Sequence, residues 1–239
     1  MRDLPEPDPV PPLVTVHIWR VPARSVPAAA ARMATHRGPV RRTNGLRFGK
    51  LLGTTHDRTF SLRDVDVRQY GLLATWRSER DAAEFEESQV VRSWRRVASE
   101  QWRLRLTPLS SRGRWSGRAP FGVPKPARWK GKVVALTRSR LVPAKVPKFW
   151  RAIPPVAADI AGRDGLLAAL GVSEIPVGVQ GTISVWRNAD DLTAFAYRGA
   201  PHQAVMARKD REGWYAEELF ARFGVLDSVG TFRGADPVT

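Results

Sequence analysis

Hydrophobic and polar positions along this chain switch between the period of a strand and that of a helix. A β-branched run at Leu13–Arg20 predicts a strand, and the Ala-rich stretch Pro27–Thr35 predicts a helix with proline in its first turn. Helical spacing resumes after Ser78, the expected N-cap. The stretch Gly45–Gly53 follows the Ala-rich helix, and the other elements predicted in the first half are strands at Tyr70–Arg77 and Arg103–Leu109, a helix carrying Asp81, Ala82, Phe85 and Val90, and a further helix carrying Trp94.

The second half repeats this order of switches. Lys132–Arg138 predicts a strand, and Ala144–Ala157 predicts a helix that Pro154 and Pro155 interrupt. Asn188 is the expected N-cap of a later helix, because an Asn side chain can accept a bond from the first turn. Gly165–Gly171 loosely matches Gly45–Gly53, and the other predicted elements are strands at Gly181–Arg187 and Phe220–Leu226, and helices over Ala189–Phe195 and His202–Trp214.

Matching motifs indicate that one unit has been duplicated. GRWSGRAP at Gly113–Pro120 recurs as GTFRGADP at Gly230–Pro237, and LLATWRSERDAAEF at Leu72–Phe85 recurs as ISVWRNADDLTAF at Ile183–Phe195. The order β-α-β-β-α-β is that of the ferredoxin-like unit. We therefore expect an α+β fold in which two tandem ferredoxin-like repeats pack as a fused α+β barrel. The expected boundaries are a disordered tail over 1–12, a first repeat over 13–121, a basic linker over 122–131 and a second repeat over 132–239.

Composition limits the metal and cofactor sites, the cellular location and the binding partners that we expect for this chain. The 239 residues include no cysteine, which excludes disulfides, thiolate haem ligands and Cys-type zinc sites. No apolar run reaches the roughly 18 residues that suggest a membrane helix, so we expect a cytoplasmic protein. A net charge of +16 favours phosphates, nucleic acid or anionic lipid headgroups, and it predicts attachment to an anionic membrane surface. A solvated basic face without a partner is the alternative interpretation.

His202 is the main candidate for cofactor chemistry. It follows Pro201 at a predicted helix start, and Met206 lies four residues on along the same helix face. A neutral imidazole that emerges into an apolar pocket suits an axial ligand of haem iron. Arg198 and Arg208 flank it and suit the haem propionates. The alternative is an exposed histidine at a helix start with no role.

Other polar features favour structural roles. His17 is interpreted as a satisfied strand histidine, with a cavity-lining role as the alternative, and His36 as the cationic end of a short helix. Glu217 and Glu218 are adjacent, and adjacent side chains point apart on a helix. The sequence has no P-loop, no GxGxxG after a strand, no HExxH and no nucleophile elbow.

Several segments together resemble the spheroidene monooxygenase family. They are GLRFGKLLGT at Gly45–Thr54, YGLLATW at Tyr70–Trp76, SVWRNADDLTAFAYRGAPHQAV at Ser184–Val205, GWYAEELFARFGVL at Gly213–Leu226 and GTFRG at Gly230–Gly234. The similarity covers nearly the whole chain from Leu13 to Pro237. It implies O2-dependent oxygenation of a carotenoid-like apolar substrate, with haem b as the cofactor. It also agrees with the tandem ferredoxin-like layout.

The resemblance also suggests roles for particular residues. Haem enzymes of this architecture, such as aldoxime dehydratase, hold the iron with a helix histidine of the second repeat, and His202 matches that position. Ser184, Arg187 and Arg47 are candidates for distal or propionate groups, Ser184 and Arg187 for the catalytic ones. Reducing equivalents would come from an external electron donor, because the sequence has no flavin or NAD motif.

Three other functions stay open at this point. A haem-dependent dehydratase or lyase acting on a C–N or N–O bond would need neither O2 nor a reductant. A haem-binding or sensing protein would catalyse nothing, and a nucleic-acid binder would use the basic surface, although no specific nucleic-acid motif is present. Either a monomer or a homodimer is compatible with the duplication.

Overall fold

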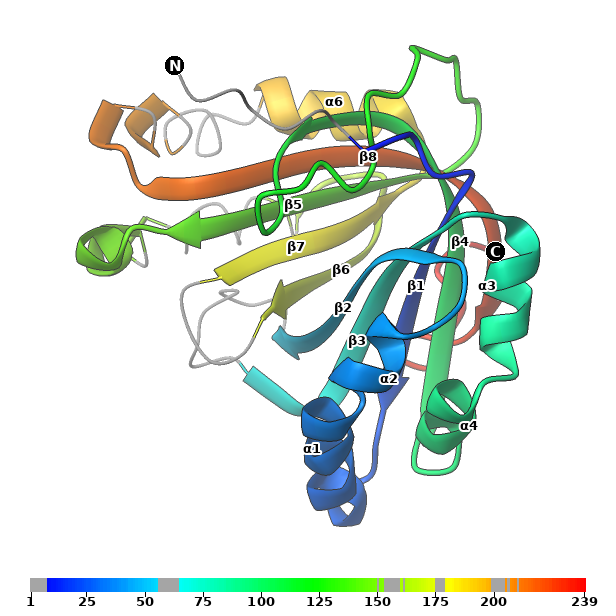
Figure 1. Cartoon of the computed structure of the whole chain (residues 1–239). Coiled ribbons are helices and arrows are strands. Elements are labelled where there is room, and N and C mark those ends of the chain that lie inside the picture. Colours follow the sequence, from blue (N-terminus) through cyan, green and yellow to red (C-terminus); the bar gives the residue numbers. More distant parts are fainter. Residues whose placement is uncertain are drawn as a thin grey trace.

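The structure is a computed structural model that describes residues 8–55, 65–149, 151–152, 160, 162–174, 179–198, 205, 207–209 and 211–239, without the side chains of residues 179, 197 and 198. In these residues eight antiparallel strands close into one barrel in the order β1-β3-β2-β6-β7-β5-β8-β4 (Figure 1). The strands are β1 Leu13–Arg20, β2 Leu46–Thr55, β3 Val65–Trp76, β4 Glu100–Gly113, β5 Val133–Leu141, β6 Leu166–Ser173, β7 Val179–Trp186 and β8 Tyr215–Gly230.

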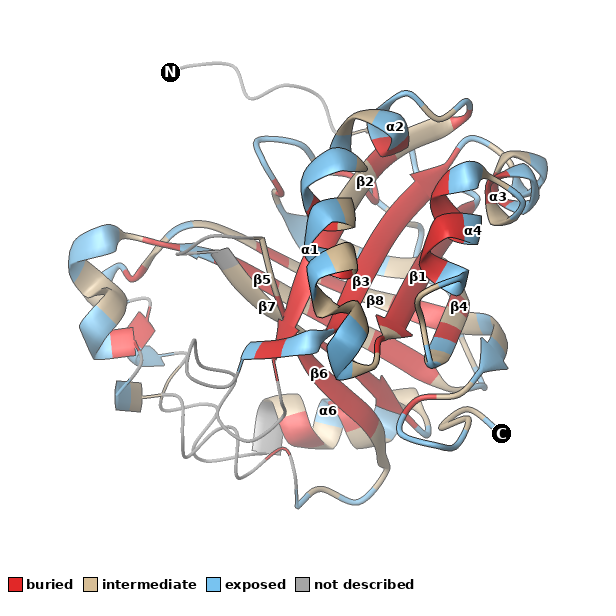
Figure 2. Cartoon of the chain, turned by 90° about the horizontal axis from the view of Figure 1, so that it is seen from below, coloured by how far each residue is buried: buried red, intermediate tan, exposed pale blue. Residues whose placement is uncertain are grey.

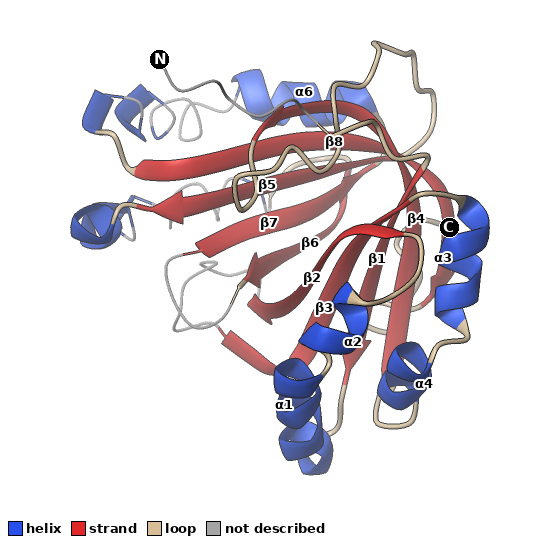
Figure 3. Cartoon of the chain, viewed as in Figure 1, coloured by secondary structure: helices blue, strands red, loops and turns tan. Residues whose placement is uncertain are grey.

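The helices lie outside the barrel, on the outer face of each half (Figure 3). The first half carries α1 Val26–Thr35, α2 Arg37–Arg41, α3 Glu79–Glu86 and α4 Gln89–Arg95. The second half carries α6 Ala189–Arg198, together with helical residues at 146–149, 151–152, 205, 207–209 and 211–212. Within the described residues, no helix has the length and hydropathy to cross a bilayer.

The strand order confirms two ferredoxin-like repeats. Each half has its last strand beside its first, giving β4-β1-β3-β2 and β8-β5-β7-β6. The halves meet along two antiparallel seams of unequal length. The β4–β8 seam extends from Trp102 opposite Gly230 to Gly113 opposite Leu219, whereas the β2–β6 seam has three residue pairs, from Gly53 opposite Ser173 to Thr55 opposite Gly171.

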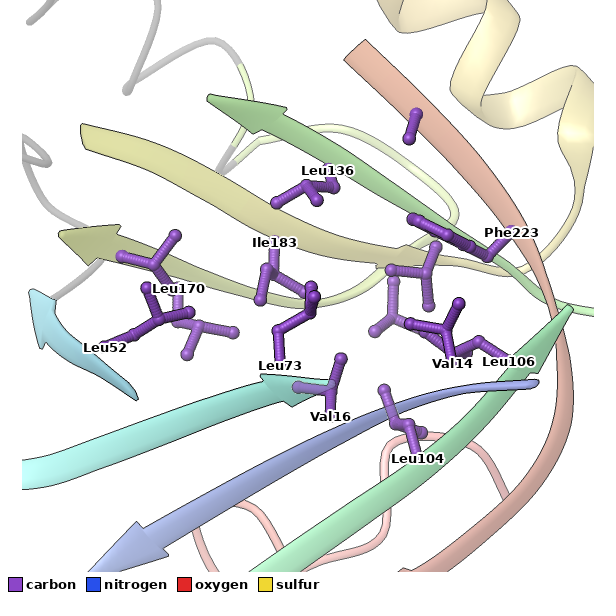
Figure 4. Close-up of a cluster of buried hydrophobic side chains, with 14 of the residues drawn as sticks. Val14, Val16, Leu52, Leu73, Leu104, Leu106, Leu136, Leu170, Ile183 and Phe223 are labelled. Atoms are coloured by element: carbon purple, nitrogen blue, oxygen red, sulfur yellow. The ribbon is translucent and has the colours of Figure 1, made fainter. Parts of the chain in front are cut away.

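Alternation along the strands divides the apolar side chains between the barrel interior and the helices. On β1, Val14, Val16 and Ile18 belong to the cluster inside the barrel, whereas Leu13 and Trp19 pack toward the helices. Figure 4 shows the interior filled from both repeats, with Val16 and Leu73 of the first facing Leu136 and Ile183 of the second. Neither sheet could bury this face alone, so the two repeats fold as one body.

The duplicated glycine motif closes both ends of the barrel. Gly113 and Gly230 have φ of +93° and +91°, and a Cβ at either position would lie 2.1–2.2 Å from a carbonyl oxygen of the neighbouring strand. The chain then turns inward and buries Trp115 at one end and Phe232 at the other. Glycine is needed here for both its backbone conformation and its lack of a side chain.

Both predicted N-caps are confirmed. The Asp81 amide donates to Ser78 Oγ at 3.1 Å, and the Asp191 amide donates to Asn188 Oδ1 at 2.8 Å. The prediction of one helix from Asp81 through Val90 is wrong, because Ser88 caps a separate helix, α4, which contains Val90.

The C-terminal boundary between helix and strand also differs from prediction. The helix ends at residue 212 and β8 begins at Tyr215, well before the predicted Phe220. Glu217 and Glu218 therefore lie on a strand and face opposite sides of the sheet, not different sides of a helix. Pairing with both β4 and β5 extends this strand, which is a long-range cause that local spacing cannot reveal.

The segments predicted as tail and linker have contacts of their own. In the described part of the tail, Pro11 is buried and Asp8 pairs with Arg118 at 3.0 Å. In the linker, Trp129 Nε1 donates to the Lys132 carbonyl oxygen at 3.0 Å. The proposed domain boundaries stay predictions.

Candidate functional site

The two repeats can be compared residue by residue because their strands pair in the same register. Leu13 lies opposite Trp76 in the first repeat, and Val133 lies opposite Trp186 in the second. We call the side chains between each sheet and its own helices the helix-facing layer of that repeat. Equivalent positions in the two layers can then be matched, and their side chains compared.

Large side chains fill the helix-facing layer of the first repeat, and Figure 2 shows that much of β1, β3 and α4 is buried. Trp19 lies between His17 and Trp94, with ring centroids 5.3 Å and 5.0 Å apart, and Tyr70 packs on Trp94 at 5.3 Å. Leu72 in the same layer is fully buried. This layer is a continuous apolar core without room for a further group.

The second repeat has small side chains at the matching positions. Two clusters of large described side chains lie at opposite ends of β5, one around Val133 and Trp186 and the other around Leu141, Phe149 and Trp214. Between these ends the sheet surface carries hydroxyls, an amide and a glycine. The matched pairs, first repeat named first, are His17 and Thr137, Trp19 and Ser139, Leu72 and Thr182, Tyr70 and Gln180, and Leu51 and Gly171.

Two separate hydrogen bonds involve the hydroxyls on this surface. Thr137 Oγ1 and Thr182 Oγ1 are 2.7 Å apart on neighbouring strands. Ser184, a predicted site residue, is 4% exposed, and its Oγ accepts a hydrogen bond from Trp186 Nε1 at 2.9 Å. Because the indole can only donate, the Ser184 hydroxyl hydrogen is left to donate toward a group above the sheet.

The described helical residues 205, 207–209 and 211–212 lie on the other side of this layer. Val205 packs against the cluster of Leu141, Phe149 and Trp214. Lys209 is 5% exposed, with Nζ 2.6 Å from Glu218 Oε2 and within 5.7 Å of the Phe220 ring centroid. Val205 and Lys209 therefore mark the helix face that is turned toward the sheet, four residues apart as helical packing requires.

Two predicted site residues lie outside the described residues. These are His202, the predicted iron ligand, and Met206. Arg198 ends α6, and its side chain is also outside the described part of the chain.

The other predicted arginines do not meet at the second repeat's layer. Arg187 is 59% exposed at its side chain and binds Asp191 through two hydrogen bonds of 2.8 Å and 3.1 Å, which raise its pKa. Arg47 lies on β2 in the first repeat, and its guanidinium donates to the Pro9 carbonyl oxygen at 3.3 Å. Their catalytic or cofactor roles stay predictions.

Arg208 lies on the solvent side of the segment 205–212. Its Nε donates to Glu212 Oε1 at 2.7 Å, and its guanidinium stacks 5.4 Å from the Trp214 ring. The hydrogen bonds from Arg208 and Trp214 lower the pKa of Glu212 to about 2. A propionate would have to compete with this carboxylate for Arg208.

His17 is a buried strand residue as predicted, but only one of its ring nitrogens is paired, since Nδ1 has no hydrogen-bond partner among the described residues. The ring is 3% exposed, its Nε2 lies 2.6 Å from Glu86 Oε1, and it stacks on Trp19. Burial raises the pKa of Glu86, but the hydrogen bond and charge of His17, together with Arg103 and Arg95, lower it below the ordinary value. The ring of His36 packs edge-on against Trp94 as a structural residue, but the prediction that it is cationic is not supported, because burial and the charge of Arg32 lower its pKa.

A second polar group, absent from the sequence predictions, lies at one end of the barrel. This barrel-end cluster consists of Lys50, Trp115, Arg138, Glu174 and Glu217. Arg138 is 4% exposed and forms ion pairs with Glu217 and, at 3.3 Å, with Glu174. Glu174 also accepts bonds from Trp115 Nε1 and Lys50 Nζ, each at 2.6 Å. Ile18 occupies the position of the first repeat that is equivalent to Arg138.

The barrel-end cluster holds the turn that follows β4. Glu217 accepts hydrogen bonds from the amides of Ser116 at 3.0 Å and Gly117 at 2.7 Å. Burial raises the pKa of Glu217, but these amides and Arg138 lower it below the ordinary value. Two carboxylates balance two cations, so the cluster closes the barrel end without a net charge.

A comparison of equivalent positions in the two halves of the sequence would have singled out two features. These are the small hydroxyl side chains of the second repeat's layer and the barrel-end cluster. The predictions did not single out Thr137, Thr182 or Arg138, because each is an ordinary strand residue when considered alone. Among the described residues, no three His, Asp or Glu side chains converge as metal ligands.

Comparisons with known proteins identify relatives over nearly the whole length. No model of a known protein family matches the chain. The spheroidene monooxygenase of Rhodobacter capsulatus is 32% identical over 95% of this chain and 95% of its own length. That of Rubrivivax gelatinosus is 35% identical over 80% of this chain and 73% of its own length.

Solved structures share the fold at low sequence identity. An aldoxime dehydratase in complex with butyraldoxime has a TM-score of 0.61 at 12% identity, over 93% of this chain and 82% of its own. A second aldoxime dehydratase has a TM-score of 0.59 at 11% identity, over 91% and 83%. At these identities the likeness shows the fold alone.

Proposed function

The chain belongs to the spheroidene monooxygenase family, and from this premise we propose that it is a haem-dependent monooxygenase of an apolar, carotenoid-like substrate. Its relatives are monooxygenases by name, so the chain is an oxidoreductase. The observation that carries the finer proposal is the contrast between the two helix-facing layers. One layer is filled by large side chains, and the other has small ones at the same positions.

The second layer fits a flat, largely apolar cofactor. The second repeat has small side chains at Thr137, Ser139 and Thr182. The equivalent positions of the first repeat carry the larger side chains of His17, Trp19 and Leu72. Bulky apolar groups remain at both ends, and interiors are normally packed without voids larger than a water molecule. The described side chains in the middle of this layer are small, and this supports a flat group such as haem b as the occupant that we propose.

His202 is the residue we propose to hold the haem iron. It precedes Val205 by three residues and Lys209 by seven, and both of these face the sheet. If the helix extends back to position 202 with the same 3.6-residue period, His202 lies on the face that Val205 and Lys209 turn toward the sheet. Met206 would pack beside the ring, and Arg198 and Arg208 would hold the propionates. Bound haem supplies the redox chemistry of O2 activation, with electrons from an external donor.

The chain's own residues would then organise the reacting groups. Ser184 keeps a hydrogen free to donate, because its oxygen already accepts from Trp186. The Thr137 and Thr182 pair likewise has one hydroxyl hydrogen to spare. These donors would orient a polar oxygen atom above the sheet while the apolar ends exclude water. Roles for Arg187 and Arg47 would require both side chains to move, because Arg187 binds Asp191 and Arg47 donates to the Pro9 carbonyl oxygen.

Haem titration followed by absorbance tests the cofactor. We expect a stoichiometric Soret band in the wild type, a lost or shifted band in His202→Ala, and an unchanged band in the control His36→Ala. A second variant, Ser139→Trp with Thr182→Leu, gives the second repeat the side chains of the first and should abolish binding. Failure of the wild type to bind haem, or full binding by the refilled variant with native circular dichroism, would contradict the proposal.

Reaction with a carotenoid under 18O2 tests the chemistry. A product that gains one labelled oxygen atom supports a monooxygenase, with the dependence on an electron donor as a second readout. Turnover of an aldoxime without O2 and without reductant would instead establish the dehydratase alternative. The haem titration distinguishes failure of the substrate proposal from failure of the cofactor proposal.

A further inference from the structure

The first repeat carries a basic surface on which most of the exposed arginines have no acid partner among the described residues. We call α1, α2, α4 and the short helical turn Ala23–Ser25 the basic face. Its exposed arginines that form no ion pair with any described residue are Arg24, Arg37, Arg41, Arg42, Arg92 and Arg96. Residues 9–55 contain no Asp or Glu at all. Among the described residues, Arg95 of α4 pairs with Glu86 and Glu87, and the six arginines named above keep their positive charge without an acid partner.

Exposed arginines elsewhere behave differently. Arg80, Arg187 and Arg208 each bind an acid one helical turn away, at 2.7–2.8 Å. These three arginines are each paired with an acid four residues further along the chain, whereas six exposed arginines of the basic face have no acid partner among the described residues. Codon usage alone would enrich arginine everywhere and would not remove the acids from one face.

The arginines form one continuous surface because the three helices pack together. Arg32 on α1 donates from Nε to the Ser93 carbonyl oxygen of α4 at 3.1 Å. His36, between α1 and α2, has its ring 6.4 Å from that of Trp94 on α4. Figures 1 and 2 both show α1, α2 and α4 on the same outer side of the first sheet.

An apolar edge adjoins the charged surface. Val65 and Val67, at the start of β3, are 42% and 55% exposed. The Val21 amide donates to the Arg68 carbonyl oxygen at 2.7 Å, which places this edge beside the turn that carries Arg24. Cationic side chains next to exposed apolar ones are the pattern of a protein surface that rests on a bilayer.

From this juxtaposition we propose that the basic face docks onto the anionic phospholipid headgroups of a membrane. Arginine forms bidentate bonds to phosphate, and the valines reach the boundary between headgroups and acyl chains. Duplex nucleic acid offers phosphates but no apolar layer for the valines. Among the described residues no aromatic ring is highly exposed, so the face has no stacking platform for single strands. This docking does not depend on the haem proposal.

Vesicle sedimentation of the whole protein tests the docking. We expect binding to phosphatidylcholine vesicles that contain phosphatidylglycerol and not to phosphatidylcholine alone. Salt should weaken the binding, since the Debye length falls from about 10 Å at 0.1 M to about 3 Å at 1 M. Removing three charges with Arg24→Gln, Arg41→Gln and Arg42→Gln should weaken partitioning about 100-fold, at about 1 kcal/mol for each arginine.

A control with the same loss of charge separates the face from the net charge. Lys125, Arg128 and Lys130 are exposed in the linker segment, which Figure 1 shows at the opposite end of the molecule from α1. Their replacement by Gln should weaken partitioning by less than about tenfold, because they lie beyond the Debye length from the bilayer. Val65→Ser with Val67→Ser should reduce the part of the binding that survives high salt.

Three results would overturn the proposal. They are equal losses in the two triple variants, equal binding to charged and uncharged vesicles, and preferential binding to duplex DNA in competition with the vesicles. A native circular dichroism spectrum of each variant is required in every case. Haem binding of the same preparations serves as a second check that the fold is retained.

Discussion

Trp19 and Ser139 occupy equivalent strand positions, and each accounts for the character of its repeat. Trp19 is 1% exposed and stacks on two rings, so it completes a core. Ser139 is 8% exposed on a surface of small side chains. The same backbone thus supports a filled layer in one repeat and, as we propose, a ligand site in the other. The difference lies in side-chain volume and not in chain path.

Substitutions at these two positions should have very different effects on stability. Trp19→Ala removes a buried indole and should lower the free energy of unfolding by about 3–5 kcal/mol. Ser139→Ala removes one oxygen atom and should change it by less than about 1 kcal/mol. Urea denaturation measures both. A comparable loss in the two variants would show that the second layer is as tightly filled as the first.

Arg138 should behave as a buried charge whose partners depend on it. Arg138→Met leaves the carboxylates of Glu217 and Glu174 without that cation and should cost about 3–5 kcal/mol. Adding Glu217→Gln removes one uncompensated charge and should restore part of the loss. Urea denaturation of the single and double variants measures the coupling, and losses that simply add would contradict it.

At the scale of elements, caps and seams set local stability. Ser78 and Ser88 cap α3 and α4, and each side-chain oxygen accepts one amide of its helix. Ser78→Ala should therefore lower stability by about 1 kcal/mol, whereas Ser78→Asp should retain most of it. Thermal melting of the two variants provides the comparison, and equal melting temperatures would argue against the cap.

The two seams of the barrel should open with different ease. The β2–β6 seam has three residue pairs, whereas the β4–β8 seam runs along most of both strands. Amides of Thr54 and Thr55 should therefore exchange with solvent deuterium earlier than those of Leu104 and Leu106. Hydrogen exchange read by mass spectrometry tests this order. Simultaneous exchange would mean that the barrel opens as one unit.

At the scale of the whole molecule, acid should destabilise the fold in a defined window. The pKa values of Glu86 and Glu217 lie below the ordinary 4.5, and an unfolded chain binds these protons first as pH falls. Their contribution is complete above the unfolded pKa and is lost as pH falls through the folded one. The free energy of unfolding should therefore decline below about pH 5. In the Glu86→Gln variant the free energy of unfolding should fall less steeply with decreasing pH. An unchanged slope would show that Glu86 does not contribute to the acid destabilisation.

The sequence by itself determined the repeat, the strand and helix order and both N-caps. These features depend on residues close together in the chain, such as Ser78 with Asp81 or Gly113 with Pro120. The family followed from motifs spread over the whole length. Tertiary structure alone decided where β8 begins, how the barrel closes and which buried charges meet. It also revealed the contrast between the two helix-facing layers, because side-chain volume at Thr137 or Ser139 has meaning only once His17 and Trp19 are known to occupy the equivalent place.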